Sequence, residues 1–135
     1  MEELEILDIK KTSINYYCTE LDKLLEKGFA KADYSVVLGE LKDDVNIKKA
    51  EINFMLFLNT EEFVDLDKSQ NIDAKIELTY IMIFSTSNDL NEIDDKMIMV
   101  HIEPYIRKEL FDFYSEIGLP TIPLPYRFWN HDKKK

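Results

Sequence analysis

Residues 98–129 constrain the fold of this chain more than any other stretch, because a helical apolar stripe is followed there by a run of prolines. Gly118 separates the two parts, and a glycine takes the positive φ of a helix end without steric cost. Pro120, Pro123 and Pro125 then exclude helix and favour extended backbone. The sequence therefore predicts an amphipathic helix followed by an extended segment. The stripe repeats at the α-helical period and consists of Ile102, Ile106, Leu110, Phe113 and Ile117.

The extended segment carries large apolar side chains between its prolines. We expect it to lie on another surface of the protein, since it would otherwise expose a large apolar patch. Its apolar side chains are Leu119, Ile122, Leu124, Tyr126, Phe128 and Trp129.

Four segments ahead of the helix alternate apolar and polar residues with the period of a β-strand. A helix at the extreme N-terminus competes with the first of them, and residues 22–33 and 62–71 are predicted to be connections. Sequential strands with short connections usually pair antiparallel. The predicted fold class is therefore α+β, with a four-stranded antiparallel sheet, then a long helix, then an extended Pro-rich C-terminal segment. The strand segments are 4–21, 34–41, 49–61 and 73–85.

The third and fourth strands become apolar on both faces towards one end. Phe57 shows this in the third strand, and Ile81 and Ile83 show it in the fourth. Strands with two apolar faces need a packing partner on each face of the sheet. The helix supplies one, and the other is a second subunit, the proline-rich segment or a bound polypeptide.

The start of the helix is open to two interpretations. Asn91 and Asp94 are both good N-cap residues. Pro104 either kinks one long helix or is the first residue of the main one. We favour two parts: a less regular 95–103, then a helix from Pro104 to Ile117.

Composition excludes several classes of partner. The chain of 135 residues is predicted to form a single domain over 1–135, and its net charge of −10 argues against nucleic acid and anionic membrane as partners. Cys18 is the only cysteine, no signal-peptide pattern opens the chain, and no run is long and apolar enough to span a membrane. These features predict a cytoplasmic protein.

No catalytic or metal-binding pattern is present in the sequence. The two histidines, His101 and His131, are far from any cysteine or from each other, so no metal-ligand spacing results. The three glycines are scattered and form no phosphate-binding loop. The sequence therefore predicts no enzyme activity, no metal and no cofactor.

The last quarter of the chain carries a motif in three parts: Pro104, Tyr105, Arg107 and Leu110, then Gly118, Leu119 and Pro120, then, with slightly altered spacing, Leu124, Pro125 and Phe128. In this motif the chain resembles the bacterial SecB protein-export chaperones and their SecB-like relatives. The resemblance implies subunits that join their sheets into dimers, which pack through helices into a tetramer. Tyr114 and Ile117 are candidates for that helix packing, although a plain core face fits them better.

The chain departs from the SecB pattern in two places. The resemblance implies a second helix after the Pro-x-x-Phe segment, but here Trp129 is followed only by a short polar stretch. Alignment of the first strand also places Ser13 and Tyr17 where SecB proteins carry acidic residues that contact the SecA motor. Contact with SecA therefore gains no support from the resemblance.

Together these features predict a cofactor-free chaperone that holds non-native polypeptide, a preprotein or an antitoxin, on an apolar groove of an oligomer. The alternative is a structural or adaptor protein with one fixed, folded partner and no holding activity. A third reading is that these side chains merely complete the core of one subunit. The predicted groove consists of Leu119, Ile122, Leu124, Tyr126, Phe128 and Trp129, with Phe57, Ile81 and Ile83 as its floor.

Overall fold

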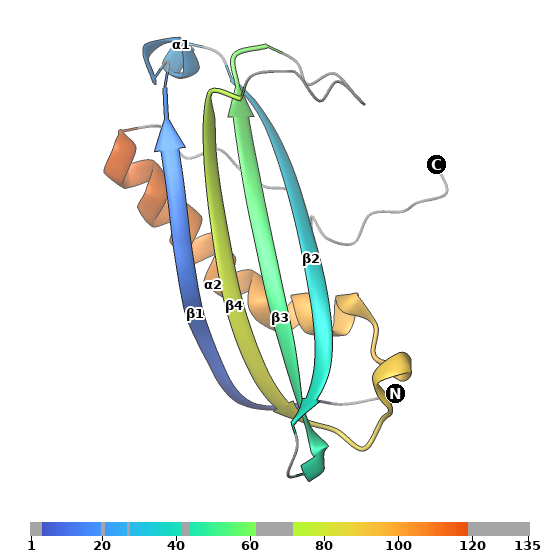
Figure 1. Ribbon diagram of the computed structural model, residues 1–135. Helices are drawn as coiled ribbons and strands as arrows, with labels where there is room; N and C mark the ends of the chain where they lie inside the picture. Colours follow the sequence, from blue (N-terminus) through green and yellow to red (C-terminus); the bar gives the residue numbers. More distant parts are fainter. Residues whose placement is uncertain (1–3, 20, 27, 42–43, 62–71, 119–135) are drawn as a thin grey trace.

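The computed structural model describes residues 4–19, 21–26, 28–41, 44–61 and 72–118. They form a four-stranded antiparallel sheet in the order β1-β4-β3-β2 with one long helix, α2, against it (Figure 1). This arrangement confirms the predicted α+β fold class, and the Pro-rich segment lies outside the described residues. The elements are β1 (Glu5–Cys18), α1 (Leu21–Glu26), β2 (Phe29–Leu41), β3 (Asp44–Asn59), β4 (Ala74–Ser85), the 3-10 helix η1 (Leu90–Glu92) and α2 (Asp95–Ile117).

The core lies between the sheet and α2, on what we call the helix side of the sheet. Burial alternates strictly along β4, so that every second side chain is buried. Phe54 of β3 lies opposite Leu78 of β4, and neither exposes any of its surface. On α2, Ile102 and Ile106 are fully buried as well. The buried side chains of the strands and those of the helical stripe therefore pack together in one apolar layer.

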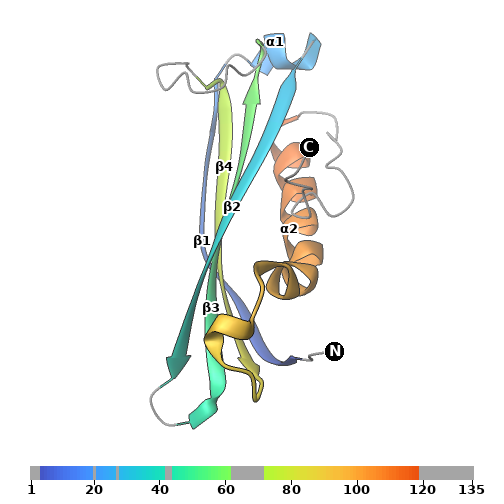
Figure 2. The same ribbon diagram turned by 90° about the vertical axis from the view of Figure 1, so that its right-hand side faces the viewer.

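The opposite face, which we call the outer side, carries none of the described helices. Figure 2 shows the sheet edge-on, with α2 running along one face only. In Figure 1, α2 crosses behind the strands on a diagonal, from β2 and β3 at its N-terminal end towards β1 at its C-terminal end. Among the described residues, the outer side is consequently a long surface formed by strand residues alone.

The helix is continuous from Asp95 to Ile117, so the predicted division at Pro104 was wrong. Asp94 is the N-cap, and its side chain accepts a hydrogen bond of 3.2 Å from the Lys96 amide. Pro104 is exposed, and its missing N–H leaves the carbonyl of Val100 without a helical donor. Because the Val100 side chain is itself exposed, water can reach this turn, and burial of the stripe on both sides of Pro104 outweighs the lost hydrogen bond.

The strands begin and end at different residues from those predicted. β1 is strand from Glu5 onward, so the competing N-terminal helix does not form over the described residues. β2 begins at Phe29 instead of residue 34, and β3 at Asp44 instead of residue 49. A short helix, α1, occupies part of the predicted 22–33 connection. Cross-strand pairing of β2 with β3 extends both strands through charged residues whose local pattern is not that of a strand.

Asp73 closes the base of the β3–β4 connection. Its carboxylate accepts hydrogen bonds from the Thr60 amide at 2.9 Å and from the Thr60 hydroxyl at 2.8 Å. Its backbone carbonyl accepts from the Thr19 amide at 2.7 Å and from the Thr19 hydroxyl at 2.9 Å. One residue therefore ties together the ends of β1, β3 and β4.

Replacing Asp73 by alanine is expected to lower the free energy of unfolding by about 1–2 kcal/mol, because two hydrogen-bond donors at Thr60 lose their acceptor. Urea denaturation followed by circular dichroism measures this loss. Asp8→Ala is the control, since Asp8 is exposed and makes only a 4.0 Å ion pair with Lys10. Equal stability of the two variants would show that Asp73 does not close the sheet.

Candidate functional site

A polar belt crosses the middle of the outer side from β1 to β2. The strand register sets Ser13 opposite Thr79, Thr79 opposite Asn53, and Asn53 opposite Ser35. The Asn53 side-chain amide donates to the Thr79 hydroxyl at 3.1 Å and to a Glu77 carboxylate oxygen at 3.0 Å. The belt divides the apolar residues of the outer side into two groups.

The three predicted floor residues lie on this face but in different groups. Ile81 and Ile83 lie on one side of the belt, and Phe57 lies on the other, opposite Lys75. Lys75 and Ile81 are six positions apart along β4, which corresponds to about 20 Å along a strand. All three side chains are half-buried, and Lys75 Nζ lies 5.8 Å from the centre of the Phe57 ring. The six other predicted groove residues, from Leu119 to Trp129, lie outside the described residues.

Charges on the outer side alternate in sign. Asp8 lies 4.0 Å from Lys10 on β1, and Lys75 lies 3.8 Å from Glu77 on β4. The net charge of −10 is therefore not concentrated on this face. The charged residues of the face are Glu5, Asp8, Lys10, Lys31, Asp33, Lys49, Glu51, Lys75 and Glu77.

The two positions aligned with the acidic residues of SecB both face outward. Ser13 is part of the polar belt, and Tyr17 lies opposite Lys75. The Tyr17 hydroxyl donates to the carbonyl of Ile72 at 3.3 Å. Neither position contributes negative charge to the outer side.

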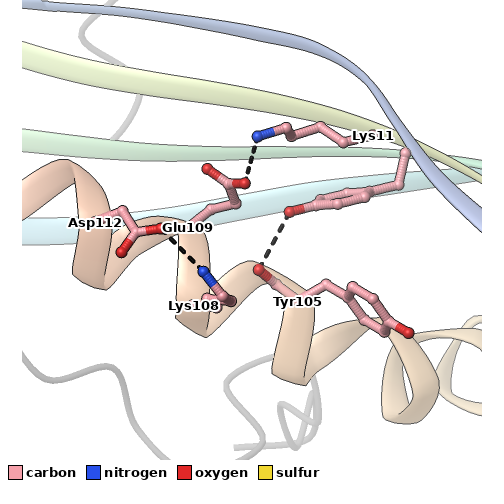
Figure 3. Close-up of polar contacts among 6 residues, drawn as sticks. Lys11, Tyr105, Lys108, Glu109 and Asp112 are labelled. Atoms are coloured by element: carbon pink, nitrogen blue, oxygen red, sulfur yellow. Dashed lines mark hydrogen bonds and ion pairs between the residues drawn. The ribbon is translucent and has the colours of Figure 1, made fainter.

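On the helix side, β1 and β4 are fastened to α2 by side-chain contacts (Figure 3). Lys11 of β1 forms an ion pair with Glu109. The Tyr80 hydroxyl donates to the carbonyl of Tyr105 at 3.2 Å, and burial raises the pKa of Tyr80 well above its usual range, with a further contribution from Glu109. The Tyr80 hydroxyl therefore remains a hydrogen-bond donor at any physiological pH.

The residues of the C-terminal motif have structural roles in α2. Leu110 is buried, and the Tyr105 backbone accepts the Tyr80 hydrogen bond. Arg107 donates from Nε to Glu103 at 2.7 Å, and its Nη2 lies 2.6 Å from the same oxygen. Glu103 is only 8% exposed, although it is acidic. Our reading of the sequence missed this pair, but its i,i+4 spacing on a helix was a usable signal.

Several large apolar side chains remain exposed and were not part of the predicted groove. On β1 they are Leu7, Ile14, Tyr16 and Tyr17, on β2 they are Val37 and Leu41, and on α2 they are Val100, Tyr105 and Phe111. Tyr114, in contrast, is buried in the core, and Ile117 packs against that core. The core reading of Tyr114 and Ile117 is thus the one that the structure supports.

The described residues bring together no reactive constellation. They contain no group of three or more His, Cys, Asp or Glu side chains that could hold a metal ion. Burial, followed by the charge of Asp73, raises the pKa of the Cys18 thiol, which disfavours the reactive thiolate. No helix among these residues has the length and hydropathy needed to cross a membrane.

Comparison with known proteins gives one informative result. No protein-family model matches the sequence, and no curated protein matches it either. Among solved structures, the chain is similar to the SecB-like chaperone of Mycobacterium tuberculosis, solved in complex with a ChAD peptide from the HigA1 antitoxin. The TM-score is 0.67 and the sequence identity 12%, over 90% of this chain and 88% of that chain.

The chain has the SecB-like fold. The likeness spans nearly the whole of both chains, so it is not limited to the C-terminal motif that first indicated it. At 12% identity it establishes the SecB-like architecture and not the activity. The resemblance inferred from the sequence is therefore confirmed at the level of the fold.

Proposed function

We propose that this SecB-like chain is a cytoplasmic holding chaperone that binds non-native polypeptide, a preprotein or an antitoxin, without cofactor or catalysis. The observation that carries the proposal is the likeness to a chaperone solved with an antitoxin peptide. Residues 1–135 form its single domain in this proposal. The chain assembles as a dimer or dimer of dimers, and SecA is not among its expected partners.

Client binding uses apolar surface in the proposed mechanism. Burial of apolar side chains favours binding by about 25 cal/mol per Å² before entropic costs, and it discriminates little between sequences. Such a surface therefore selects for unfolded segments, which expose apolar side chains that a folded protein buries. The proposed groove combines Leu119, Ile122, Leu124, Tyr126, Phe128 and Trp129 with Phe57 or the Ile81 and Ile83 pair as its floor.

The rival function is an adaptor with one fixed, folded partner. The outer side of the sheet is the observation that favours it, because alternating charges and half-buried apolar side chains suit a defined docking surface. Such a partner would be recognised only in its folded state. The two functions therefore differ in whether an unfolded protein is bound.

The deciding experiment follows light scattering while an unfolded client protein aggregates with and without this chain. We expect suppression at a stoichiometric ratio, and we expect Phe128→Ser or Trp129→Ser to weaken it several-fold because each removes a large apolar contact. Phe111→Ser is the control, since Phe111 is an aromatic residue that is 58% exposed on α2 and is not part of the proposed groove.

Oligomeric mass is measured for every variant, so that loss of assembly is not mistaken for loss of the groove. Failure of the wild-type chain to suppress aggregation of any unfolded client would favour the adaptor. Equal activity of all three variants and wild type would remove the C-terminal segment from the groove.

A further inference from the structure

Two neighbouring rows of side chains lie beside the polar belt on the outer side of the sheet. Strand pairing sets one residue of every strand in each row, and the two rows are two positions apart along each strand. We call the two rows together the two-row patch. From β1 to β2, the first row is Lys10, Ile81, Glu51 and Val37, and the second row is Asp8, Ile83, Lys49 and Gly39.

Several side chains of the two-row patch have no partner within one subunit. Val37 is 63% exposed, more than any other large apolar side chain that the structure describes. Among the described residues, the side chains of Lys49 and Glu51 form no ion pair and no hydrogen bond. Asp8 and Lys10 lie 4.0 Å apart, and both are exposed. Exposed apolar area beside unpaired charge indicates a surface that another protein covers.

The residues on the other side of the belt are less suited to such a contact, because their charges already have partners. Lys75 Nζ lies 3.8 Å from Glu77 Oε1 and 5.8 Å from the centre of the Phe57 ring. Glu77 Oε2 accepts the hydrogen bond of 3.0 Å from Asn53. A partner docked there would compete with these interactions, whereas Lys49 and Glu51 of the two-row patch are available to it.

The charges of the two-row patch are complementary to those of a second copy of the same patch. A two-fold axis that runs across the strands, between the two rows, sets each row opposite the other row of the second copy. Lys10 then faces Asp8 of the second copy, and Glu51 faces Lys49 of the second copy. By symmetry each of these pairs forms twice. The charges cancel within the patch, so the net charge of the chain does not oppose this contact locally.

The apolar residues fit the same symmetry. Ile81 faces Ile83 of the second copy near the centre of the contact. Val37 faces Gly39 of the second copy, where an added Cβ would meet no atom within 4 Å, so the exposed Val37 side chain has room there. We propose that two copies of this chain pack the outer sides of their sheets face to face, with antiparallel strands, through the two-row patch. Sheets packed in this way lie about 10 Å apart with nearly aligned strands.

Other registers of the same contact are less favourable. An axis through the first row sets Lys10 opposite Lys10 and Glu51 opposite Glu51. An axis between the first row and the belt sets Ile81 opposite Thr79 and Glu51 opposite Asn53. Of these three axes, only the one between the two rows sets every charge opposite one of the other sign. The pattern of side chains therefore selects one register by repulsion as well as by attraction.

The contact has the size of a reversible interface. The two-row patch and the row on either side of it cover about 19 Å across the strands and about 27 Å along them. That corresponds to about 500 Å² for each copy and about 1,000 Å² in total, the lower limit for a specific interface. The inference goes beyond the holding function and does not depend on it, since the contact covers Ile81 and Ile83 but leaves Phe57 open. It also differs from the edge-to-edge and helix-to-helix contacts that the SecB resemblance implies.

Charge reversal tests the register, with the dimer dissociation constant measured by sedimentation velocity over a concentration series. Glu51→Lys sets a lysine opposite Lys49 of the second copy, twice by symmetry, and should raise the constant at least about tenfold. The double variant Lys49→Glu/Glu51→Lys exchanges the two charges and should restore the constant to within about twofold. Asp33→Lys is the matched control, since Asp33 is an exposed acidic residue beyond the belt, opposite Met55 on the outer side. It should change the constant less than about twofold.

A second measurement uses the wild-type chain alone. Unlabelled chain is mixed with chain carrying a heavy nitrogen isotope and is treated with a carbodiimide. The reagent joins a lysine amine to a neighbouring carboxylate as an amide and takes up the water that is lost. We expect a Lys49–Glu51 link between peptides of different isotope content, because the two residues belong to different copies. β3 is not an edge strand of the sheet, so pairing of two sheet edges does not bring these residues together.

Absence of the mixed-isotope link would overturn the inference, and so would an unchanged dissociation constant in Glu51→Lys. Equal weakening by Asp33→Lys, or a double variant as weak as Glu51→Lys, would show a general effect of charge and would overturn it as well. If Glu51→Lys does not fold, the cross-link in the wild-type chain still decides the question. Suppression of aggregation is measured separately, so failure of the face-to-face contact leaves the holding function in place.

Discussion

Phe54→Ala is expected to lower the free energy of unfolding by about 3–5 kcal/mol, which is the range for removing a buried aromatic ring. Phe54 lies at the centre of the sheet, between Tyr34 of β2 and Leu78 of β4, with none of its surface exposed. Loss of the ring removes apolar burial and leaves a cavity that two hydrogen-bonded neighbouring strands cannot easily fill. Urea denaturation monitored by circular dichroism gives the value.

Phe57→Ala is the matched control for that measurement. Phe57 belongs to the same strand but faces the outer side, where it is half-buried beside Lys75. We expect a loss of about 1–2 kcal/mol, since less apolar area is returned to water. Equal losses for the two variants would mean that both faces of β3 are equally buried, for example by a partner on the outer side.

Ile102→Asp should abolish cooperative folding or bring the chain close to that limit. Ile102 is the first residue of the apolar stripe on α2 and is fully buried against the sheet. An unpaired carboxylate there loses its hydration, and the expected cost of several kcal/mol is comparable with the whole stability of a domain of this size. Loss of the sharp thermal transition and binding of a dye for exposed apolar surface would report the effect.

Phe111→Asp introduces the same charge on the same helix, but at an exposed position. Comparison of the two variants therefore distinguishes the effect of the charge itself from the effect of burying it. Phe111 is 58% exposed, so we expect a change within about 1 kcal/mol. A cooperative transition in Ile102→Asp similar to that of Phe111→Asp would contradict the position of α2 on the sheet.

The sequence allowed the central elements to be predicted, because they obey a single period over many residues. β4 alternates without exception, and the stripe from Ile102 to Ile117 keeps the helical period through Pro104. The proline nevertheless misled us about the length of the helix. Sequence rules for helices treat proline as a helix breaker, because it lacks the amide hydrogen. Here burial of the apolar residues before and after Pro104 holds one continuous helix against the sheet.

The candidate site was less accessible to sequence reasoning, since it depends on which residues become neighbours across strands. Phe57 and Ile81 both follow the apolar trend of their strands, but only the register shows that Asn53 and Thr79 lie between them. The irregular pairing of β1 with β4 and the Lys11–Glu109 pair, whose members are 98 residues apart, likewise depend on contacts across the fold. Neither feature leaves a local pattern in the chain.

The closure made by Asp73 and Thr60 has a consequence for how this architecture can vary between genomes. Thr60 and Asp73 join the two strand ends at the first residues beyond the ladder. The entropic cost of bringing two chain ends together grows only slowly with the number of residues between them. Insertions and deletions over 62–71 should therefore accumulate in natural variants with little effect on sheet register.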